Sequence, residues 1–461
     1  EVRLGRCELL RVSAREGGAV EIGPAPDSQT FFRYIDSLET QLIQRVTSDR
    51  GRHSSRFFAH LFNPESGITF FAGFLTFDRL HTVHDLTHGR GLGVRDLTAA
   101  CDFNGFPLAP GDVVLCSLME HHSNDLPWRA AAHTVHIRLT PDGRLDLADF
   151  EEQLDRYADR VALVAITGAS NVTGLLNPIH QLAEQAHAVG ALFMADCAQL
   201  APHRKVEMLP LSDPAHLDFV SISAHKMYAP FGTGAIVGRR DIFERGDPDM
   251  TGGGTVEIVT LENVIWADPP EREEAGSPNT VGAVALAAAL RQLSQVGMDA
   301  VAAHEAELTA YALERLNRMP EVRIFGDRNP AHAAHRLGVI PLELTTTHHF
   351  LASAILGYEF GIGVRSGCFC AHPYILHLLG LSHEEAARVR EDILSGDRSN
   401  MPGLIRASFG LYNTLEDVDI LIDALARIAK GDYQGQYVQD RASGEYTPVG
   451  WEPAYAQYFR L

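Results

Sequence analysis

Between Asp112 and Arg240, short apolar runs alternate with segments of helical periodicity, and this alternation most constrains the fold. Four apolar runs are the expected strands: residues 113–116, 160–166, 191–195 and 219–222. Residues 147–157 and 179–189 have the helical pattern and lie between strands. Because strands joined by helices form parallel sheets, we expect an α/β fold with a mostly parallel sheet.

Polar residues follow two of these strands directly, where functional residues of such folds gather. Asp196 closes the run 191–195, and Lys226 follows the run 219–222. A lysine amine beside a cofactor aldehyde can form a Schiff base, and a carboxylate beside a pyridine nitrogen keeps that ring protonated. An aspartate after a strand is more often a cap or turn residue. Together, however, the two residues favour a pyridoxal-phosphate site.

Two more turns after strands carry candidate residues. His121 could stack flat on a cofactor ring, and Asn171 could hydrogen-bond a ring hydroxyl. Each has an ordinary alternative, because histidine pairs in turns are usually solvated and asparagine is common beside glycine in turns. Neither residue would be persuasive without the other.

The pattern changes from Gly282 onward. Residues 283–295 and 301–317 are expected helices, and residues 322–325 and 337–342 are expected strands of a smaller α+β domain. The expected organisation is an N-terminal segment packing with the small domain, a large cofactor-binding domain, a small C-terminal domain and a loop-rich tail, at residues 1–50, 51–290, 291–430 and 431–461.

Composition excludes some classes of function. A formal charge of −20 over 461 residues argues against a nucleic-acid surface. No apolar stretch reaches the roughly 20 residues of a membrane helix, and the first residues lack the layout of a signal peptide. Six scattered cysteines favour reduced thiols over a disulfide framework. We therefore expect a cytoplasmic protein with no membrane and no nucleic-acid partner.

Six segments, taken in order, resemble the large domain of the fold-type I pyridoxal-phosphate enzymes. The closest resemblance is to the class V aminotransferase group, which includes cysteine desulfurases and selenocysteine lyases, and it extends from about Pro110 to Ala429. The fold that it implies is a large domain with a mostly parallel sheet plus a smaller α+β domain. The segments are residues 119–124, 170–174, 195–199, 223–226, 274–279 and 406–414.

The resemblance implies roles around the cofactor ring. Lys226 corresponds to the Schiff-base lysine, and His121 to the residue stacked on the ring, both counted as catalytic. Asp196 corresponds to the partner of the pyridine nitrogen. Gln199 and Asn171 correspond to ligands of the ring hydroxyl, and Asn171 also adjoins the substrate. Pyridoxal 5'-phosphate is therefore the expected cofactor.

The resemblance also implies how the phosphate is held. Ser223 and His225 match phosphate ligands, and Ser277 matches a residue that reaches the phosphate from a neighbouring subunit, which implies a homodimer with shared sites. The family usually has a Gly-Thr-Thr-like turn that also cradles the phosphate. Here residues 75–77 would align with that turn and offer the single hydroxyl of Thr76.

The stretch of residues 364–373 bears most directly on the reaction. Cys370 matches the nucleophilic cysteine of the desulfurase branch, and Arg365 and Arg406 resemble residues near the substrate carboxylate. The implied reaction converts L-cysteine to L-alanine and leaves a persulfide on Cys370, from which a sulfur-acceptor protein could take the sulfur. His372 could lower the pKa of the Cys370 thiol.

Other interpretations remain open. Cys368 with Cys370 and His372 could bind a metal, but no second ligand pair lies nearby, so no metal is expected. Cys368 is better explained as a small packed side chain. A carbon-sulfur lyase, a molybdenum-cofactor-sulfurase-like sulfur transferase or an aminotransferase would use the same scaffold, and a non-catalytic scaffold protein is a further alternative.

Overall fold

The computed structural model describes residues 108, 111–229, 231–245, 247–248 and 250–452, together with the backbone of four strands nearer the start of the chain. Those four strands form one sheet in sequence order: β1 (Leu10–Ala14), β2 (Val20–Pro24), β3 (Phe57–Asn63) and β4 (Ile68–Phe74). The predicted N-terminal segment and the residues around Thr76 otherwise lie outside the described residues.

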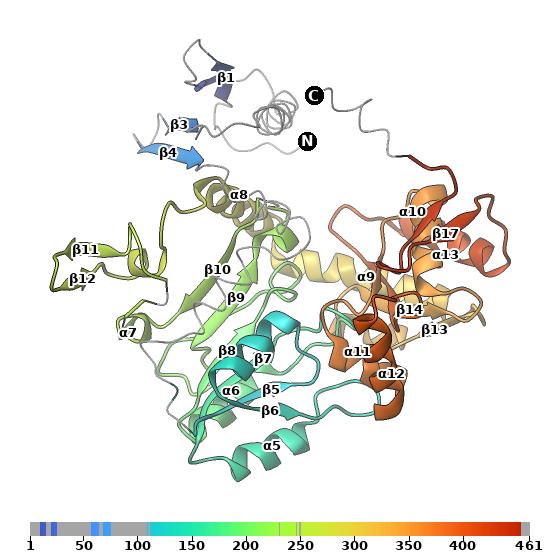
Figure 1. Ribbon diagram of the computed structural model, residues 1–461, viewed down its shortest axis with the longest axis horizontal. Helices are drawn as coiled ribbons and strands as arrows, with labels where there is room; N and C mark the ends of the chain where they lie inside the picture. Colours follow the sequence, from blue (N-terminus) through green and yellow to red (C-terminus); the bar gives the residue numbers. More distant parts are fainter. Residues whose placement is uncertain are drawn as a thin grey trace.

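A six-stranded sheet forms the centre of the molecule, in the order β10-β9-β8-β7-β5-β6 (Figure 1). Five strands are parallel, and β10 runs antiparallel to β9 at one edge. The strands are β5 (Val113–Ser117), β6 (His133–Ile137), β7 (Val161–Thr167), β8 (Leu192–Asp196), β9 (Phe219–Ser223) and β10 (Gly234–Gly238). The predicted α/β class and the four predicted strands are confirmed, whereas β6 and β10 were not predicted.

The apolar runs become strands because both faces of this sheet are covered. Val113 and Leu115 belong to one core cluster, and Val114 and Cys116 belong to another. All four side chains are fully buried. Successive side chains of a strand point to opposite faces, so a continuous apolar run is needed wherever both faces are packed.

The helices between the strands lie close to their predicted positions. They are α5 (Leu147–Arg156) and α6 (Ile179–Ala188). The side chain of Asp146 accepts hydrogen bonds from the amides of Ala148 and Asp149 and so fixes the start of α5. Shorter helical segments are η1 (His122–Asn124), α4 (Leu126–Ala131), η2 (Ala224–Met227), α7 (Arg240–Phe243) and η3 (Glu271–Glu273).

Two long helices, α8 (Thr280–Val296) and α9 (Met298–Leu316), meet at Gly297. Gly297 has φ of 87°, a conformation that side chains rarely adopt, and the two helices are bent by 78° there. In the described part of the chain no single helix is long and apolar enough to cross a membrane, and only this bent pair reaches the required length and apolarity jointly.

A second, antiparallel sheet has the order β13-β14-β16-β15, and its strands are β13 (Val322–Ile324), β14 (Val339–Leu344), β16 (Leu404–Ser408) and β15 (Arg365–Gly367). Leu342 packs with Ile355 and Leu425 in a separate core cluster. The helices after α9 are η4 (Pro330–His335), α10 (His349–Phe360), α11 (His372–Leu379), α12 (His383–Leu394) and α13 (Leu415–Ala429). This is the predicted smaller α+β unit, but the predicted domain limits stay predictions.

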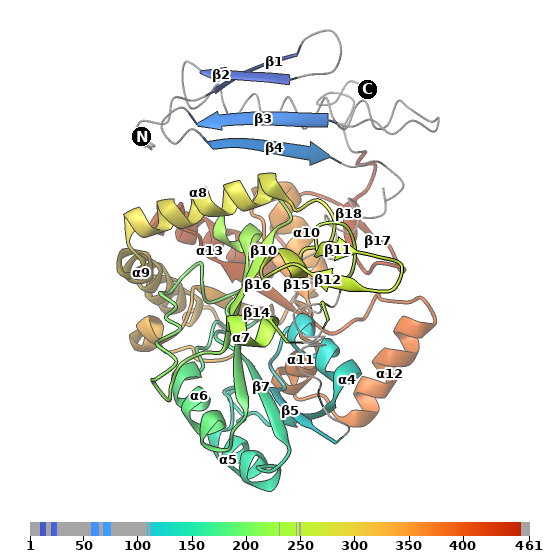
Figure 2. The same ribbon diagram turned by 90° about the vertical axis from the view of Figure 1, so that its left-hand side faces the viewer.

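Two hairpins were not predicted. β11 (Val256–Val259) and β12 (Val264–Trp266) project from the body of the molecule (Figures 1 and 2). In the tail, expected to be loop-rich, β17 (Tyr437–Gln439) pairs with β18 (Tyr446–Pro448). The carboxylate of Glu359 in α10 accepts hydrogen bonds from the amides of Gln434 and Gly435 and anchors the start of this tail.

Candidate active site

Four candidate residues lie just past or at the carboxyl ends of neighbouring parallel strands. His121 follows β5, Asn171 follows β7, Asp196 ends β8 and Lys226 follows β9. Since these strands are parallel, their carboxyl ends lie along one edge of the sheet, which is where ligands bind in open α/β sheets. The fold therefore brings the four predicted residues to one region.

Lys226 lies in η2 and is partly buried. Burial lowers the pKa of Lys226 to about 8, and the charges of Arg406 and Arg365 act in the same direction while Asp196 opposes them. Much of the amine is therefore uncharged at mildly alkaline pH, as a nucleophilic amine must be. The sequence has only two other lysines, Lys205 and Lys430, and both are exposed.

Asp196 is buried and is held at one oxygen. Its Oδ1 accepts hydrogen bonds from the Ala198 amide at 2.9 Å and from Ser221 Oγ at 3.2 Å. No bond to Oδ2 is found among the described residues. One oxygen is thus anchored, while the other remains available to a ring nitrogen.

His121 carries a neutral ring whose tautomer is set by its neighbour. The amide of Ser123 donates to His121 Nδ1 at 3.2 Å, so Nδ1 accepts and the proton lies on Nε2. Burial lowers the pKa of His121 to about 3, with the charge of Lys226 adding to the effect. A neutral, flat imidazole suits a stacking role better than a role as a cation.

Glu120 is a residue that sequence reasoning missed, although it lies inside a motif that was singled out. Its buried carboxylate accepts hydrogen bonds from Ser117 Oγ at 2.6 Å, Asn124 Nδ2 at 2.7 Å and the Thr167 amide at 3.0 Å. Burial nevertheless raises the pKa of Glu120 to about 8. This group links the end of β5 to the end of β7.

The loop that carries Cys370 is clamped at two adjacent carbonyls. Asn171 Nδ2 donates to the carbonyl of Phe369 at 2.7 Å, and the His122 amide donates to the carbonyl of Cys370 at 2.8 Å. Phe369 and Cys370 have φ of 52° and 57°, in the left-handed region that costs free energy for residues with side chains. The two hydrogen bonds fix this strained turn.

The Cys370 thiol is close enough to influence two cations. A charge on Cys370 raises the pKa of both Lys226 and Arg406. The thiol therefore lies within electrostatic reach of both Lys226 and Arg406. Cys370 is partly exposed, as attack on a ligand requires. Burial lowers the pKa of His372, so that ring is neutral near pH 7, and its predicted influence on the Cys370 thiol stays a prediction.

His372 instead stacks on His122, with ring centroids 4.9 Å apart and planes inclined by 4°. Its Nδ1 lies 3.0 Å from His122 Nε2. Cys368 is buried, and its Sγ donates to the carbonyl of Pro402 at 3.1 Å. Burial raises the pKa of Cys368 to about 12, so this thiol stays protonated, in agreement with a packing role.

Arg406 combines anchored and unpaired donors. Its Nη1 donates to the carbonyl of Asn171 at 2.7 Å, and its Cζ lies 5.1 Å from the ring centroid of Phe369. Its buried Nε has no hydrogen-bond partner in the described part of the protein. Burial and the charge of Arg365 lower the pKa of Arg406 to about 10. A buried guanidinium with a spare donor is suited to bind an anion.

The remaining predicted ligands are less tightly placed. Ser223 ends β9 and is partly buried, whereas His225 is exposed. Gln199 Nε2 lies 3.5 Å from His203 Nε2. Ser277 is exposed in the loop before α8, and Thr76 lies outside the described residues. The roles of these residues at the cofactor stay predictions.

The chain belongs to the class-V aminotransferase family, whose model matches residues 95–421. A cysteine desulfurase of Dickeya dadantii is 34% identical over 359 residues, covering 77% of this chain and 79% of that protein. A cysteine desulfurase of Haloferax volcanii is 35% identical, covering 69% of this chain and 68% of that one.

Solved structures agree with this family. The apo cysteine desulfurase of Thermococcus onnurineus superposes with a TM-score of 0.62 at 30% identity, covering 74% of this chain and 78% of that one. The cysteine desulfurase CsdA of Escherichia coli gives a TM-score of 0.62 at 26% identity over 75% of this chain and 78% of that one. The fold is therefore that of the fold-type I enzymes, as predicted.

Proposed function

We propose that this protein is a pyridoxal-phosphate-dependent cysteine desulfurase, which converts L-cysteine to L-alanine and carries the released sulfur as a persulfide on Cys370. The observation that carries the proposal is the strained, clamped turn that holds the Cys370 thiol within electrostatic reach of Lys226 and Arg406. The names of the relatives support the same activity.

The side chains fit the cofactor in two ways. Lys226 is partly buried, and its lowered pKa suits an amine that reacts with an aldehyde. Asp196 has an oxygen without a partner in the described residues, which suits a protonated ring nitrogen. When bound, pyridoxal phosphate withdraws electrons from the substrate Cα.

The protein's own groups then have separate tasks. Arg406, through its unpaired Nε, and Arg365 hold the substrate carboxylate. The Lys226 amine, once released from the cofactor, takes the Cα proton. The Cys370 thiolate bonds to the substrate sulfur as the Cβ–S bond breaks; carbon keeps that electron pair and later takes a proton, which gives alanine.

Product analysis tests this assignment. With L-cysteine and a thiol reductant, the enzyme is expected to give alanine and sulfide in equal amounts. Cys370→Ala is expected to lower the rate at least about 100-fold, whereas Cys368→Ala, which removes a buried packed thiol, retains most of it. Alanine formation at the normal rate by Cys370→Ala would exclude the persulfide route. Pyruvate with ammonia would indicate a carbon-sulfur lyase, and a 2-oxo acid with a pyridoxamine form would indicate an aminotransferase.

The cofactor linkage has a direct chemical test. Borohydride reduction of the holoenzyme should fix the cofactor on one lysine, and peptide mapping should find it on Lys226. The chain offers an internal control, because Lys205 and Lys430 are exposed and would be labelled only by non-specific reaction. Label on either of them at a stoichiometry equal to that of Lys226 would contradict the assignment.

We also propose a homodimer with shared sites, with a sulfur-acceptor protein as a further partner. The β11–β12 hairpin exposes Ile258, Leu261 and Ile265, an unusual concentration of apolar side chains for a solvated hairpin. Leu261→Glu should shift the sedimentation coefficient from dimer towards monomer, and Leu394→Glu, at an exposed apolar position in α12, should not. A monomeric wild-type enzyme would exclude the dimer.

A further inference from the structure

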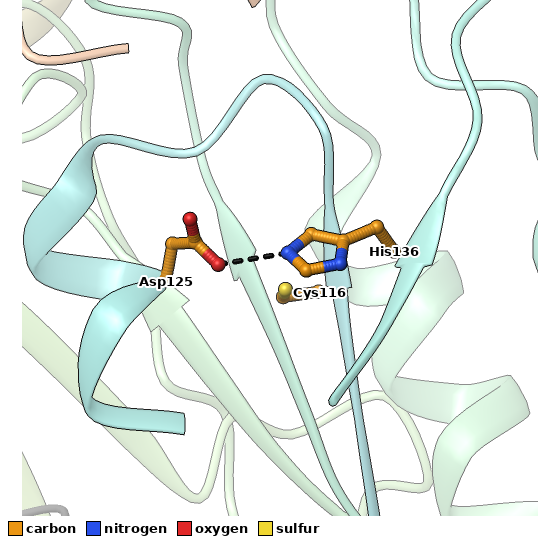
Figure 3. A group of neighbouring side chains, drawn as sticks. All are labelled: Cys116, Asp125 and His136. Carbon is orange, nitrogen blue, oxygen red and sulfur yellow. Dashed lines mark hydrogen bonds and ion pairs between the residues drawn. The ribbon is translucent and has the colours of Figure 1, made fainter. Parts of the chain in front are cut away.

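Three metal-binding side chains converge outside the candidate active site (Figure 3). Cys116 comes from β5, His136 from β6, and Asp125 from the turn between η1 and α4. Cys116 and His136 are register partners on adjacent parallel strands. One ligand atom of each residue lies within 4.8 Å of the other two. A cysteine sulfur, a histidine nitrogen and a carboxylate oxygen thus face a common point.

Neighbouring side chains already orient the carboxylate of Asp125. Arg129 donates from Nε to Asp125 Oδ1 at 2.7 Å and from Nη2 to Oδ2 at 2.6 Å. His136 Nε2 lies 2.8 Å from the same Oδ1. Asp125 and Cys116 are buried, whereas the His136 side chain is 23% exposed. The Arg129 guanidinium fixes the orientation of the Asp125 carboxylate. At metal sites, side chains that hydrogen-bond to a ligand orient it in the same way.

Solvent reaches the cluster from the side of His136. An open depression in the surface is lined by Arg129, Ala132, His133, Thr134 and His136. Thr134 lies two residues before His136 on the same strand, so both side chains point to the same face. The Thr134 hydroxyl is buried and has no hydrogen-bond partner in the described part of the chain. An unpaired hydroxyl therefore lies beside His136 on the same strand.

We propose that Cys116, Asp125 and His136 bind one divalent cation of the zinc type, with a water molecule as the fourth ligand. The mixed sulfur, nitrogen and oxygen set suits zinc in tetrahedral geometry. The thiolate and the carboxylate balance the charge of the cation, and Arg129 stays paired with Asp125. Nitrogen and oxygen ligands of tetrahedral zinc are about 3.4 Å apart, so His136 Nε2, now 2.8 Å from Asp125 Oδ1, needs to move away by about 0.6 Å.

A second group of metal-binding side chains does not have this geometry. It consists of His187, His216 and Asp218. Its two rings are stacked, with centroids 4.1 Å apart and planes inclined by 18°, so their lone pairs run nearly parallel and do not meet at one ion. Arg239 and the Phe193 amide also donate to Asp218. This cluster is a buried charge network, and it supplies a control.

Zinc titration of the holoenzyme against a chromophoric chelator tests the site. We expect one tightly bound zinc ion per chain, and an affinity at least about 100-fold weaker in Cys116→Ala and in His136→Gln. His216→Gln and Cys370→Ala should bind zinc as the wild type does. Zinc should raise the midpoint of thermal unfolding of the wild type and of Cys370→Ala, but not that of His136→Gln. Unfolding curves without zinc verify that each variant is folded.

X-ray absorption at the zinc edge identifies the ligands independently of activity. The wild type should show one sulfur scatterer at about 2.3 Å, which disappears in Cys116→Ala and persists in Cys370→Ala. Loss of that sulfur in Cys370→Ala alone would place the ion on the Cys370 loop and overturn the proposal. The absence of stoichiometric binding by the folded wild type would also overturn it.

Discussion

Arg365 and Arg406 are register partners on the antiparallel strands β15 and β16, so two guanidinium groups project from neighbouring positions on one face of the sheet. Arg365 lowers the pKa of Arg406, and no carboxylate of the described residues is among the groups that oppose this effect. Like charges placed opposite each other destabilise a sheet. An anionic substrate bound between them would relieve that repulsion.

Arg406→Gln should therefore weaken substrate binding. A hydrogen bond to a charged group contributes about 1.5–3 kcal/mol, so kcat/KM for L-cysteine should fall about 10- to 100-fold, mainly through KM. Arg406→Lys should recover only part of the loss, because a lysine keeps the charge but lacks the planar fork. Arg323→Gln, at an exposed position on β13, is the matched control. An unchanged KM in Arg406→Gln would contradict the carboxylate role.

Lys226→Met should stabilise the cofactor-free protein at neutral pH. The pKa of Lys226 is about 8 in the folded state and 10.5 when unperturbed, so below pH 8 the folded protein carries a partly desolvated ammonium at full cost. That cost disappears as the pH rises from about 8 to 10.5. The gain in the free energy of unfolding should be on the order of 2 kcal/mol at pH 7 and should shrink towards pH 10.5.

Urea denaturation at several pH values measures this difference. Lys205→Met changes an exposed lysine and should not show the trend. A gain for Lys226→Met that is equal at pH 7 and pH 10 would mean that the amine is not the origin of the effect.

Glu120→Gln should remove part of the pH dependence of stability. The pKa of Glu120 is raised from 4.5 to about 8, so between these values the folded state holds a proton that the unfolded state releases. Stability of the wild type therefore falls as the pH rises from about 4.5 to 8, by a few kcal/mol at this buried site. The wild type and Glu120→Gln should differ in the slope of unfolding free energy against pH, and parallel slopes would refute the raised pKa.

Replacing His121 with phenylalanine distinguishes ring stacking on the cofactor from a role of imidazole protonation. His121→Ala should weaken cofactor binding about 2- to 10-fold, because ring stacking contributes about 0.5–1.5 kcal/mol. His121→Phe should restore the affinity, since it keeps a flat ring. The pKa of His121 is about 3, so its protonation should not shape the activity profile above about pH 5. Affinity is measured by recovery of cofactor absorbance on titration, and equal loss in both variants would rule out stacking.

The strands of the central sheet could be predicted where they are buried on both faces. β5, β7, β8 and β9 are continuous apolar runs, but β6 includes two histidines and is mostly part-exposed, so its pattern is weak. β10 lies at the edge of the sheet and is also only partly buried. An edge strand is specified by the pairing of its backbone more than by an apolar run, and the local sequence does not reveal that pairing.

Some residues of the candidate site could likewise be predicted from the sequence, and others could not. The motifs identified Lys226, Asp196, His121 and Cys370, because each stands at a fixed place after a strand or within a recognisable loop. They did not reveal Glu120, whose importance lies in its burial and in the hydrogen bonds that join the ends of β5 and β7. Nor did they reveal that His372 is buried enough to have a lowered pKa and that its ring stacks on His122.

The sequence by itself determined the parallel sheet and the residues at its carboxyl edge, because the direction of parallel strands places their ends together whatever the loops do. Only the tertiary structure decided which distant groups meet. The pairing of Arg365 with Arg406 depends on the register of β15 and β16, and the cluster of Cys116, Asp125 and His136 depends on the register of β5 and β6 together with the turn before α4. Register is set by long-range packing, which no local pattern of residues contains.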